Sequence, residues 1–157
     1  MPPPQISSEE QRLNKLAKDL RDAADDADLN IQHVFSSHLI LAGAGHVENS
    51  VIYILSEYGR INGNPAIKRF VEKTVSRNNS LNCDKIKAIS DQFQLEWWSH
   101  IEATTKDAER DAVDSLKTLR DQIAHGRRNG TGFTVVKGYL DCAKVFVQKF
   151  SLVVLGH

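Results

Sequence analysis

Residues 116–126 read LKTLRDQIAHG, and this stretch predicts a helix together with the side of it that is buried. With steps of roughly 100° per residue, Leu119 and Ile123 fall on the same side of a helix as Leu116. The glycine that closes the stretch ends such a helix well, because glycine readily takes the left-handed conformation that follows a helix. We therefore expect an amphipathic helix that begins near Thr105 and ends at this glycine.

Helical spacing of apolar residues continues on both sides of this stretch. It predicts helices over about residues 7–27, 31–58 and 136–154, a shorter one from Pro65 and another around residues 86–93. Ser7 and Glu10 have the spacing of a capping box, so we expect the first helix to begin there. Because no run alternates with period two, the expected fold is all-α: a bundle of four main helices plus one or two short helices.

Length and composition suit a single domain. The 157 residues with 41 % apolar content predict one core, which we place in residues 7–157 behind a flexible tail over residues 1–6. The tail has no basic patch or apolar stretch typical of a signal peptide, and residues 135–155 carry four charges, too many for an ordinary membrane span. We expect a cytoplasmic protein without membrane contact. Cys83 and Cys142 are expected to be idle thiols, with a disulfide between them as the alternative.

The net charge is zero, from 20 basic and 20 acidic side chains, so no general attraction to nucleic acid is expected. The charges are unevenly distributed: residues 60–90 hold seven basic and two acidic side chains, and residues 120–157 hold six and two. Any attraction to RNA is therefore expected to be local, around Arg120, Arg127 and Arg128.

The polar side of the helix over residues 116–126 carries groups suited to phosphodiester cleavage. Asp121 and His125 lie one turn apart, opposite the apolar side, and Arg120 lies at the edge. A histidine can take or give a proton near neutral pH, an arginine can hold a phosphate with two hydrogen bonds, and the carboxylate can orient the imidazole. Two plainer interpretations stay open: the histidine as a helix cap, and Asp121 as the partner of Lys117.

The same stretch resembles the signature of the HEPN superfamily, an arginine with a polar neighbour and a histidine four to six residues later. Residues 38–48, HLILAGAGHVE, resemble the family's second helix with its inward glutamate, and residues 65–71 resemble the short helix of the RiboL-PSP-type branch. The resemblance covers about residues 8–155. Arg127 departs from some toxin branches, which have a tyrosine two residues after the histidine, so chemistry special to those branches is not expected.

The resemblance implies a helical, usually dimeric domain and a metal-independent endoribonuclease of a toxin, phage-defence or RNA-processing system. Carried over to this chain, it makes Arg120 and His125 catalytic, Asp121 the polar residue that tunes them, and Glu48 a support group. Neither a metal nor a cofactor is expected. The expected partners are the RNA substrate, a second copy of the chain that completes a shared cleft, and an antitoxin or companion defence protein.

Other HEPN domains have lost catalysis, so the alternative function is a silent module that binds RNA or a protein partner. A plain helical interaction domain is the third interpretation. Arg127 and Arg128 follow the histidine in a glycine-rich turn and are expected to bind RNA phosphates. The plainer alternative for these two arginines is a solvated surface loop.

Five further side chains are assigned to structure rather than chemistry. We expect Trp97 and Trp98 to anchor the core instead of stacking on bases. We expect His33, His38 and His46 to be surface histidines or hydrogen-bonded core histidines, because their spacing does not suit a metal site.

Overall fold

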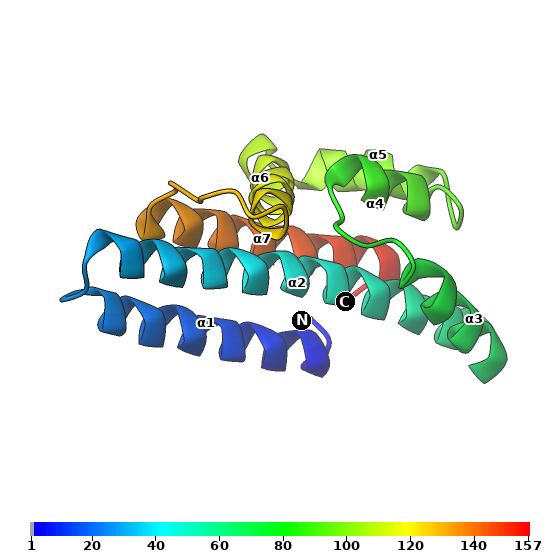
Figure 1. Cartoon of the computed structure of the whole chain (residues 1–157). Coiled ribbons are helices and arrows are strands. Elements are labelled where there is room, and N and C mark those ends of the chain that lie inside the picture. Colours follow the sequence, from blue (N-terminus) through cyan, green and yellow to red (C-terminus); the bar gives the residue numbers. More distant parts are fainter. Residues whose placement is uncertain (1) are drawn as a thin grey trace.

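The computed structural model of the chain describes residues 2–157, and within that range it contains seven helices and no strand (Figure 1). Four helices are long: α1 (Pro4–Ala24), α2 (Leu29–Asn62), α6 (Asp107–Ala124) and α7 (Phe133–Leu155). Three are short: α3 (Pro65–Val75), α4 (Cys83–Ser90) and α5 (Glu96–Thr104). The expected all-α class is confirmed, with three short helices in place of one or two.

Helix α2 lies at the centre and contacts α1, α3, α6 and α7. In Figure 1, α1, α2 and α7 run side by side, and α6 lies across α2 and α7 and is seen nearly end-on. Gly43 makes this crossing close, because a Cβ atom placed there would lie 3.2 Å from Leu140 and 3.4 Å from Leu116. Both leucines are fully buried, so the motif-bearing helix is seated on the core at its middle.

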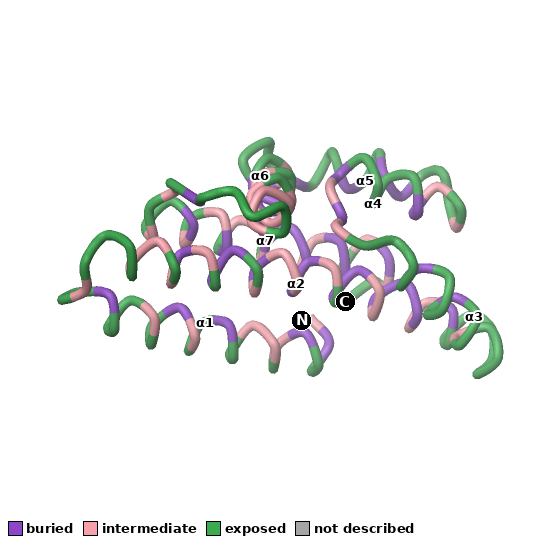
Figure 2. The backbone as a smooth tube through the Cα atoms, viewed as in Figure 1, coloured by how far each residue is buried: buried purple, intermediate pink, exposed green. Residues whose placement is uncertain are grey.

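Burial follows the helical spacing expected from the sequence. Figure 2 shows buried residues along the inward sides of α2 and α7, while most outer turns of the helices are exposed. Helix α2 is also long and apolar enough to span a membrane by length and composition, but 56 % of its most apolar window is buried in this fold. Packing against four other helices accounts for that apolar character.

The start of the first helix differs from the prediction. Helix α1 begins at Pro4, a residue that favours the first helical turn, and Ile6 is buried with 1 % of its surface exposed. Ser7 therefore lies inside the helix, and no side-chain hydrogen bond caps its start. The predicted capping box is wrong, and residues 4–6 are part of α1, not of a flexible tail. Met1 lies outside the described residues.

Helix α5 was not predicted as a separate helix, because its nine residues are too few to show a clear period. Trp97 and Trp98, both in this helix, are buried, which confirms their expected role as core anchors. The Trp97 ring makes an edge-to-face contact with Tyr58 at 4.8 Å between ring centroids and stacks on Phe93 at 5.9 Å. These contacts hold α5 against the far end of α2.

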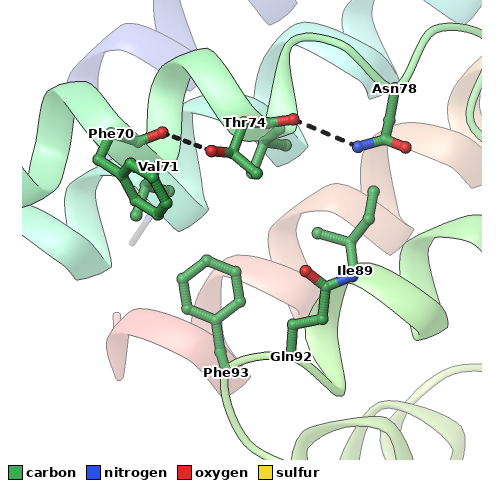
Figure 3. A pocket seen from close by; sticks show the side chains of 8 residues that line it. Phe70, Val71, Thr74, Asn78, Ile89, Gln92 and Phe93 are labelled. Atoms are coloured by element: carbon green, nitrogen blue, oxygen red, sulfur yellow. Dashed lines mark hydrogen bonds between the residues drawn. The ribbon is translucent and has the colours of Figure 1, made fainter.

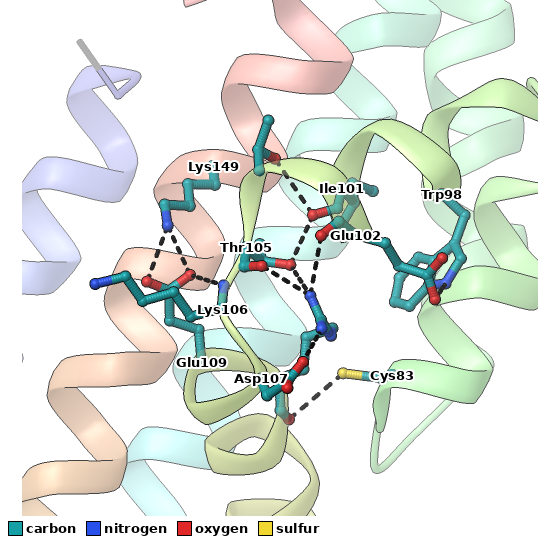
Figure 4. A network of polar contacts seen from close by, with 11 residues as sticks. Cys83, Trp98, Ile101, Glu102, Thr105, Lys106, Asp107, Glu109 and Lys149 are labelled. Atoms are coloured by element: carbon teal, nitrogen blue, oxygen red, sulfur yellow. Dashed lines mark hydrogen bonds and ion pairs between the residues drawn. The ribbon is translucent and has the colours of Figure 1, made fainter.

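A polar network fixes the beginning of α6 (Figure 4). The buried Glu109 carboxylate accepts a hydrogen bond from the Lys106 backbone N–H at 2.9 Å and from the Lys149 ammonium of α7 at 2.7 Å. Burial acts to raise the pKa of Glu109, but the hydrogen bonds from Lys149 and Lys106 outweigh it and lower that pKa. The first turn of α6 is thus bonded to α7, which helps to fix the position of the whole helix, including its C-terminal end.

Candidate active site

The C-terminal end of α6 displays His125 at the surface. Gly126 has a φ of 73°, a left-handed conformation that favours glycine. Its N–H donates to the Ile123 carbonyl at 3.0 Å, and the Arg127 N–H donates to the Gln122 carbonyl at 2.9 Å. These two bonds form a Schellman motif, which ends the helix at the histidine, as the sequence predicts. His125 is exposed there, so its imidazole is open to solvent and to a substrate.

The two sides of α6 differ as expected. Leu116 is fully buried, and Leu119 and Ile123 pack against a cluster of core residues from α1, α2 and α7. Arg120 and Asp121 are half-buried, with 35 % and 30 % of their side chains exposed. The helix therefore presents the arginine and the carboxylate at the edge of the fold, where both remain accessible.

Three donors surround the Asp121 carboxylate. The Lys117 ammonium lies 2.6 Å away, the Ser80 hydroxyl donates to it at 2.5 Å, and the Arg120 guanidinium donates at 3.3 Å. Partial burial acts to raise the pKa of Asp121, but the hydrogen bonds from Lys117, Ser80 and Arg120 outweigh it and hold that pKa at about 2. The carboxylate is thus an ion at every physiological pH.

The pairing of Asp121 with Lys117, the plainer of the two sequence interpretations, is present. The His125 backbone N–H donates to the Asp121 carbonyl at 3.0 Å, as in any helix, but within residues 2–157 no hydrogen bond or ion pair joins the Asp121 carboxylate to the His125 ring. The predicted orientation of the imidazole by the Asp121 carboxylate is therefore not the arrangement seen; its oxygens accept from Lys117, Ser80 and Arg120. Asp121 instead touches Arg120, the other residue of the motif.

Ser80 links the motif to helix α2, and the sequence gives little sign of it. Its hydroxyl donates to Asp121, and its backbone N–H donates to the Glu48 carboxylate at 3.0 Å. The Lys85 ammonium donates to the Ser80 carbonyl at 3.2 Å. Ser80 also has a φ of 59°, which is uncommon for a residue other than glycine. Glu48 thus lies in the network that ends at Arg120, reaching it through Ser80 and Asp121.

The loop after His125 is fixed to the first half of α2. Asn129 is buried, and its carbonyl accepts a hydrogen bond from the His33 ring at 2.7 Å. Its side-chain amide donates to Ser36 and Ser37 at 3.4 Å, and its side-chain oxygen accepts the Thr131 N–H at 2.9 Å. The Ser36 hydroxyl donates to the Thr131 carbonyl at 2.8 Å. This loop is therefore anchored, although its two arginines are exposed.

A cavity of about 700 Å³ lies between this loop and α2. It is lined by Arg127, Arg128, Asn129 and Gly130 of the loop, Asn30, His33, Val34 and Ser37 of α2, and Ile123 of α6. Ile123 is roughly 200° around the helix from Asp121, so the cavity and the Asp121 network flank the end of α6 on opposite sides. The predicted site residues thus form two groups near the exposed His125. One group is Arg127 and Arg128, which line the cavity. The other is Arg120 with Asp121, which Ser80 links to Glu48.

A second, smaller cavity of about 170 Å³ lies between α3 and α4 (Figure 3). Phe70, Ile89 and Phe93 point into it, together with Val71, Val75 and the polar side chains of Thr74, Asn78 and Gln92. None of these eight side chains is charged, so this cavity has no group to hold a phosphate.

The remaining titratable candidates do not form a second reactive centre. Cys83 and Cys142 are both free, and burial, with a smaller contribution from Asp114, raises the pKa of the Cys83 thiol. A thiol with a raised pKa is a poor nucleophile. His38 is exposed, and His46 is buried, with no partner for its Nε2 atom among residues 2–157. The expectation of a hydrogen-bonded core histidine is therefore only half right for His46.

Comparison with known proteins gives one family. A model of the family described as RiboL-PSP-HEPN matches residues 5–155, from the first turn of α1 to the end of α7. Searches of curated proteins and of solved structures found no match.

Proposed function

The chain belongs to the RiboL-PSP-HEPN family, and on that premise we propose that it is a metal-independent endoribonuclease. We further propose that its four long helices correspond to the HEPN bundle. In the proposed reaction the 2′-hydroxyl of a ribose loses its proton and attacks the adjacent phosphorus. The bond to the 5′-oxygen breaks, and that oxygen takes up a proton. The products are a 2′,3′-cyclic phosphate and a 5′-hydroxyl.

The observation that carries this proposal is the exposed His125 at the end of α6, five residues after a half-buried Arg120 on the same helix. An open imidazole can transfer the proton, and the guanidinium can hold the phosphate and stabilise the charge that builds up on it. Asp121 holds Arg120 from one side, and its own position depends on Ser80 and Glu48. Asp121 and Glu48 are thus proposed to position Arg120, not to touch the RNA.

A second copy of the chain would complete the chemistry. The reaction needs a base for the 2′-hydroxyl and an acid for the 5′-oxygen, and one imidazole is in only one protonation state at a time. A two-fold axis near the end of α6 would bring two copies of His125 to one cleft. We therefore propose a homodimer in which one histidine is the base and its counterpart the acid.

The test compares wild type with His125→Ala on a panel of single-stranded RNAs in the presence of a chelator. We expect the substitution to lower cleavage by about 10²–10⁴-fold, the usual contribution of a general acid or base. His38→Ala is the matched control, because His38 is an exposed histidine on another helix. Equal cleavage by wild type and His125→Ala, or no cleavage by wild type on any RNA, would refute the proposal.

One observation favours the alternative function, a silent module that binds RNA. Asp121 is occupied by Lys117 and Ser80, and His125 has no carboxylate partner within the described residues. A histidine without such a partner is less well oriented for proton transfer. Binding of RNA with unchanged product length over long incubation would support this alternative against the ribonuclease.

A further inference from the structure

We propose that the cavity between α2 and the loop after His125 binds one unpaired nucleotide of an RNA strand, and that His33 reads its base. The choice of RNA as ligand rests on the function proposed above. The site itself does not, because it is built from residues that take no part in the proposed bond cleavage.

The charge and size of the cavity suit a nucleotide. Of its nine lining residues, Arg127 and Arg128 are cationic and none is acidic. Its volume of about 700 Å³ lies within the roughly 300–1,000 Å³ of small-molecule sites. Two guanidinium groups beside an otherwise uncharged cavity favour an anionic ligand such as a phosphodiester.

The floor of the cavity suits the flat face of a base. Val34 of α2 lines the cavity with 64 % of its surface exposed, so it is open to a ligand. Ile123 contributes a second apolar surface from α6. Unpaired bases in RNA complexes stack on aromatic rings or guanidinium planes and are read along their edges by hydrogen bonds, and extruded bases also lie against apolar side chains. Apolar groups would not serve free phosphate, so they favour a nucleotide over an inorganic anion.

A hydrogen bond to the loop fixes the orientation of the His33 ring. Its Nδ1 atom lies 2.7 Å from the Asn129 carbonyl oxygen, and a carbonyl oxygen can only accept. Nδ1 therefore carries a proton, and whenever the ring is neutral Nε2 is an acceptor. Ser37 and Asn30 add further polar side chains along the same wall. An N–H group of a bound base would donate to Nε2 of His33. This hydrogen bond would distinguish bases that have an N–H group at that place from bases that do not.

The site is rigid because the same residues anchor the loop. Asn129 is buried and joins the loop to Ser36, Ser37 and His33. A preformed site loses little conformational entropy when it binds a ligand. Since Arg127 is only two residues after His125, a strand with one nucleotide in the cavity has its neighbouring phosphate near the end of α6.

The test measures binding of fluorescent A, C, G and U decamers by anisotropy, with His125→Ala as the parent so that no RNA is cut. His33→Asn is the informative variant, because an asparagine amide nitrogen takes the place of Nδ1 and keeps the bond to Asn129, while the Nε2 acceptor is lost. We expect it to weaken binding of the preferred base about tenfold, the loss of one hydrogen bond, and to flatten the base preference. His38→Asn, a histidine on the same helix outside the cavity, is the control.

A second pair of variants does not depend on the histidine. Val34→Glu puts a carboxylate on the exposed floor and is expected to weaken binding of all four decamers at least tenfold at low salt. Leu41→Glu adds the same charge on α2 outside the cavity, at a residue that is 42 % exposed, and is expected to change binding less than threefold.

The outcomes separate the two proposals. Equal affinities and equal base preference for His33→Asn and His38→Asn, or for Val34→Glu and Leu41→Glu, would overturn the nucleotide site even if wild type cleaves RNA. A base preference that depends on His33, in a protein whose wild type never cleaves RNA, would support the site and refute only the ribonuclease.

Discussion

Removal of the Ser80 hydroxyl tests the network behind Arg120. Ser80→Ala deletes the hydrogen bond to the Asp121 carboxylate and leaves the backbone N–H bond to Glu48 in place. A hydrogen bond to a charged group contributes about 1.5–3 kcal/mol, and the lower end applies because 30 % of the Asp121 side chain is exposed. We therefore expect Ser80→Ala to lower the free energy of unfolding by about 1.5 kcal/mol.

Ser80→Gly gives a matched comparison. It loses the same hydrogen bond, but glycine adopts the left-handed backbone at φ 59° without the steric cost that a side chain has there. This difference raises the free energy of unfolding by about 1 kcal/mol. The glycine variant is therefore expected to lose only about 0.5 kcal/mol, from the difference of these two effects. If Ser80 positions Arg120 through Asp121, both variants should lose about tenfold in cleavage rate, while only the alanine variant is clearly less stable.

The assays are urea unfolding at pH 7 and cleavage of a single-stranded RNA under saturating conditions. Cleavage by Ser80→Gly at the wild-type rate would refute the positioning role. The pH dependence gives a second check. Because the Asp121 pKa is held at about 2, below its usual 3.8, the stabilisation is present above about pH 4 and is lost as the pH falls toward 2. The stability difference between wild type and Ser80→Ala should shrink over the same interval.

Two other predictions concern buried polar groups. Asn129→Ala should lower the free energy of unfolding by about 1–3 kcal/mol, because buried donors and acceptors lose their partner. Hydrogen exchange should also become faster at the amides of residues 127–131. Burial, helped by Lys144, lowers the pKa of His46 to about 4, although the Glu9 carboxylate lies 3.6 Å from the ring. The unfolded chain therefore binds a proton at His46 more readily than the folded chain does. The free energy of unfolding should fall by up to about 3 kcal/mol as the pH drops from 6.5 to 4. In urea unfolding, His46→Gln should remove that part of the pH dependence.

The parts of the site that lie close together in the sequence were predictable. The spacing of Leu116, Leu119 and Ile123 predicted which side of α6 is buried, and Gly126 predicted where the helix ends. Both depend on neighbours within a few residues, where helix geometry fixes the relation. The placement of His125 at the exposed end of the helix follows from these two features alone.

The contacts that complete the site were not predictable in this way. Ser80 meets Asp121 across 41 positions and Glu48 across 32, and the His33 bond to Asn129 spans 96. Such contacts depend on how whole helices cross, and a single sequence contains no period that encodes the crossing. The residues just before α4 are mostly polar, and nothing in their sequence marks one serine as different. The positive φ of that serine is the sign of its role, and only the structure shows it.

The proposed binding of RNA by a chain with no net charge requires positive charge that is concentrated locally. The basic segment over residues 60–90 reaches the end of α6 through Ser80 and Lys85, and the second basic segment begins at Arg120. Lys85 of the first segment and Arg120 of the second are thus linked through Ser80 and Asp121. Attraction to a phosphate backbone depends on such local charge and not on the total, since solvent ions screen charges more than about 8–10 Å away. The acidic segments that cancel the total therefore do little to oppose binding at this end of the helix.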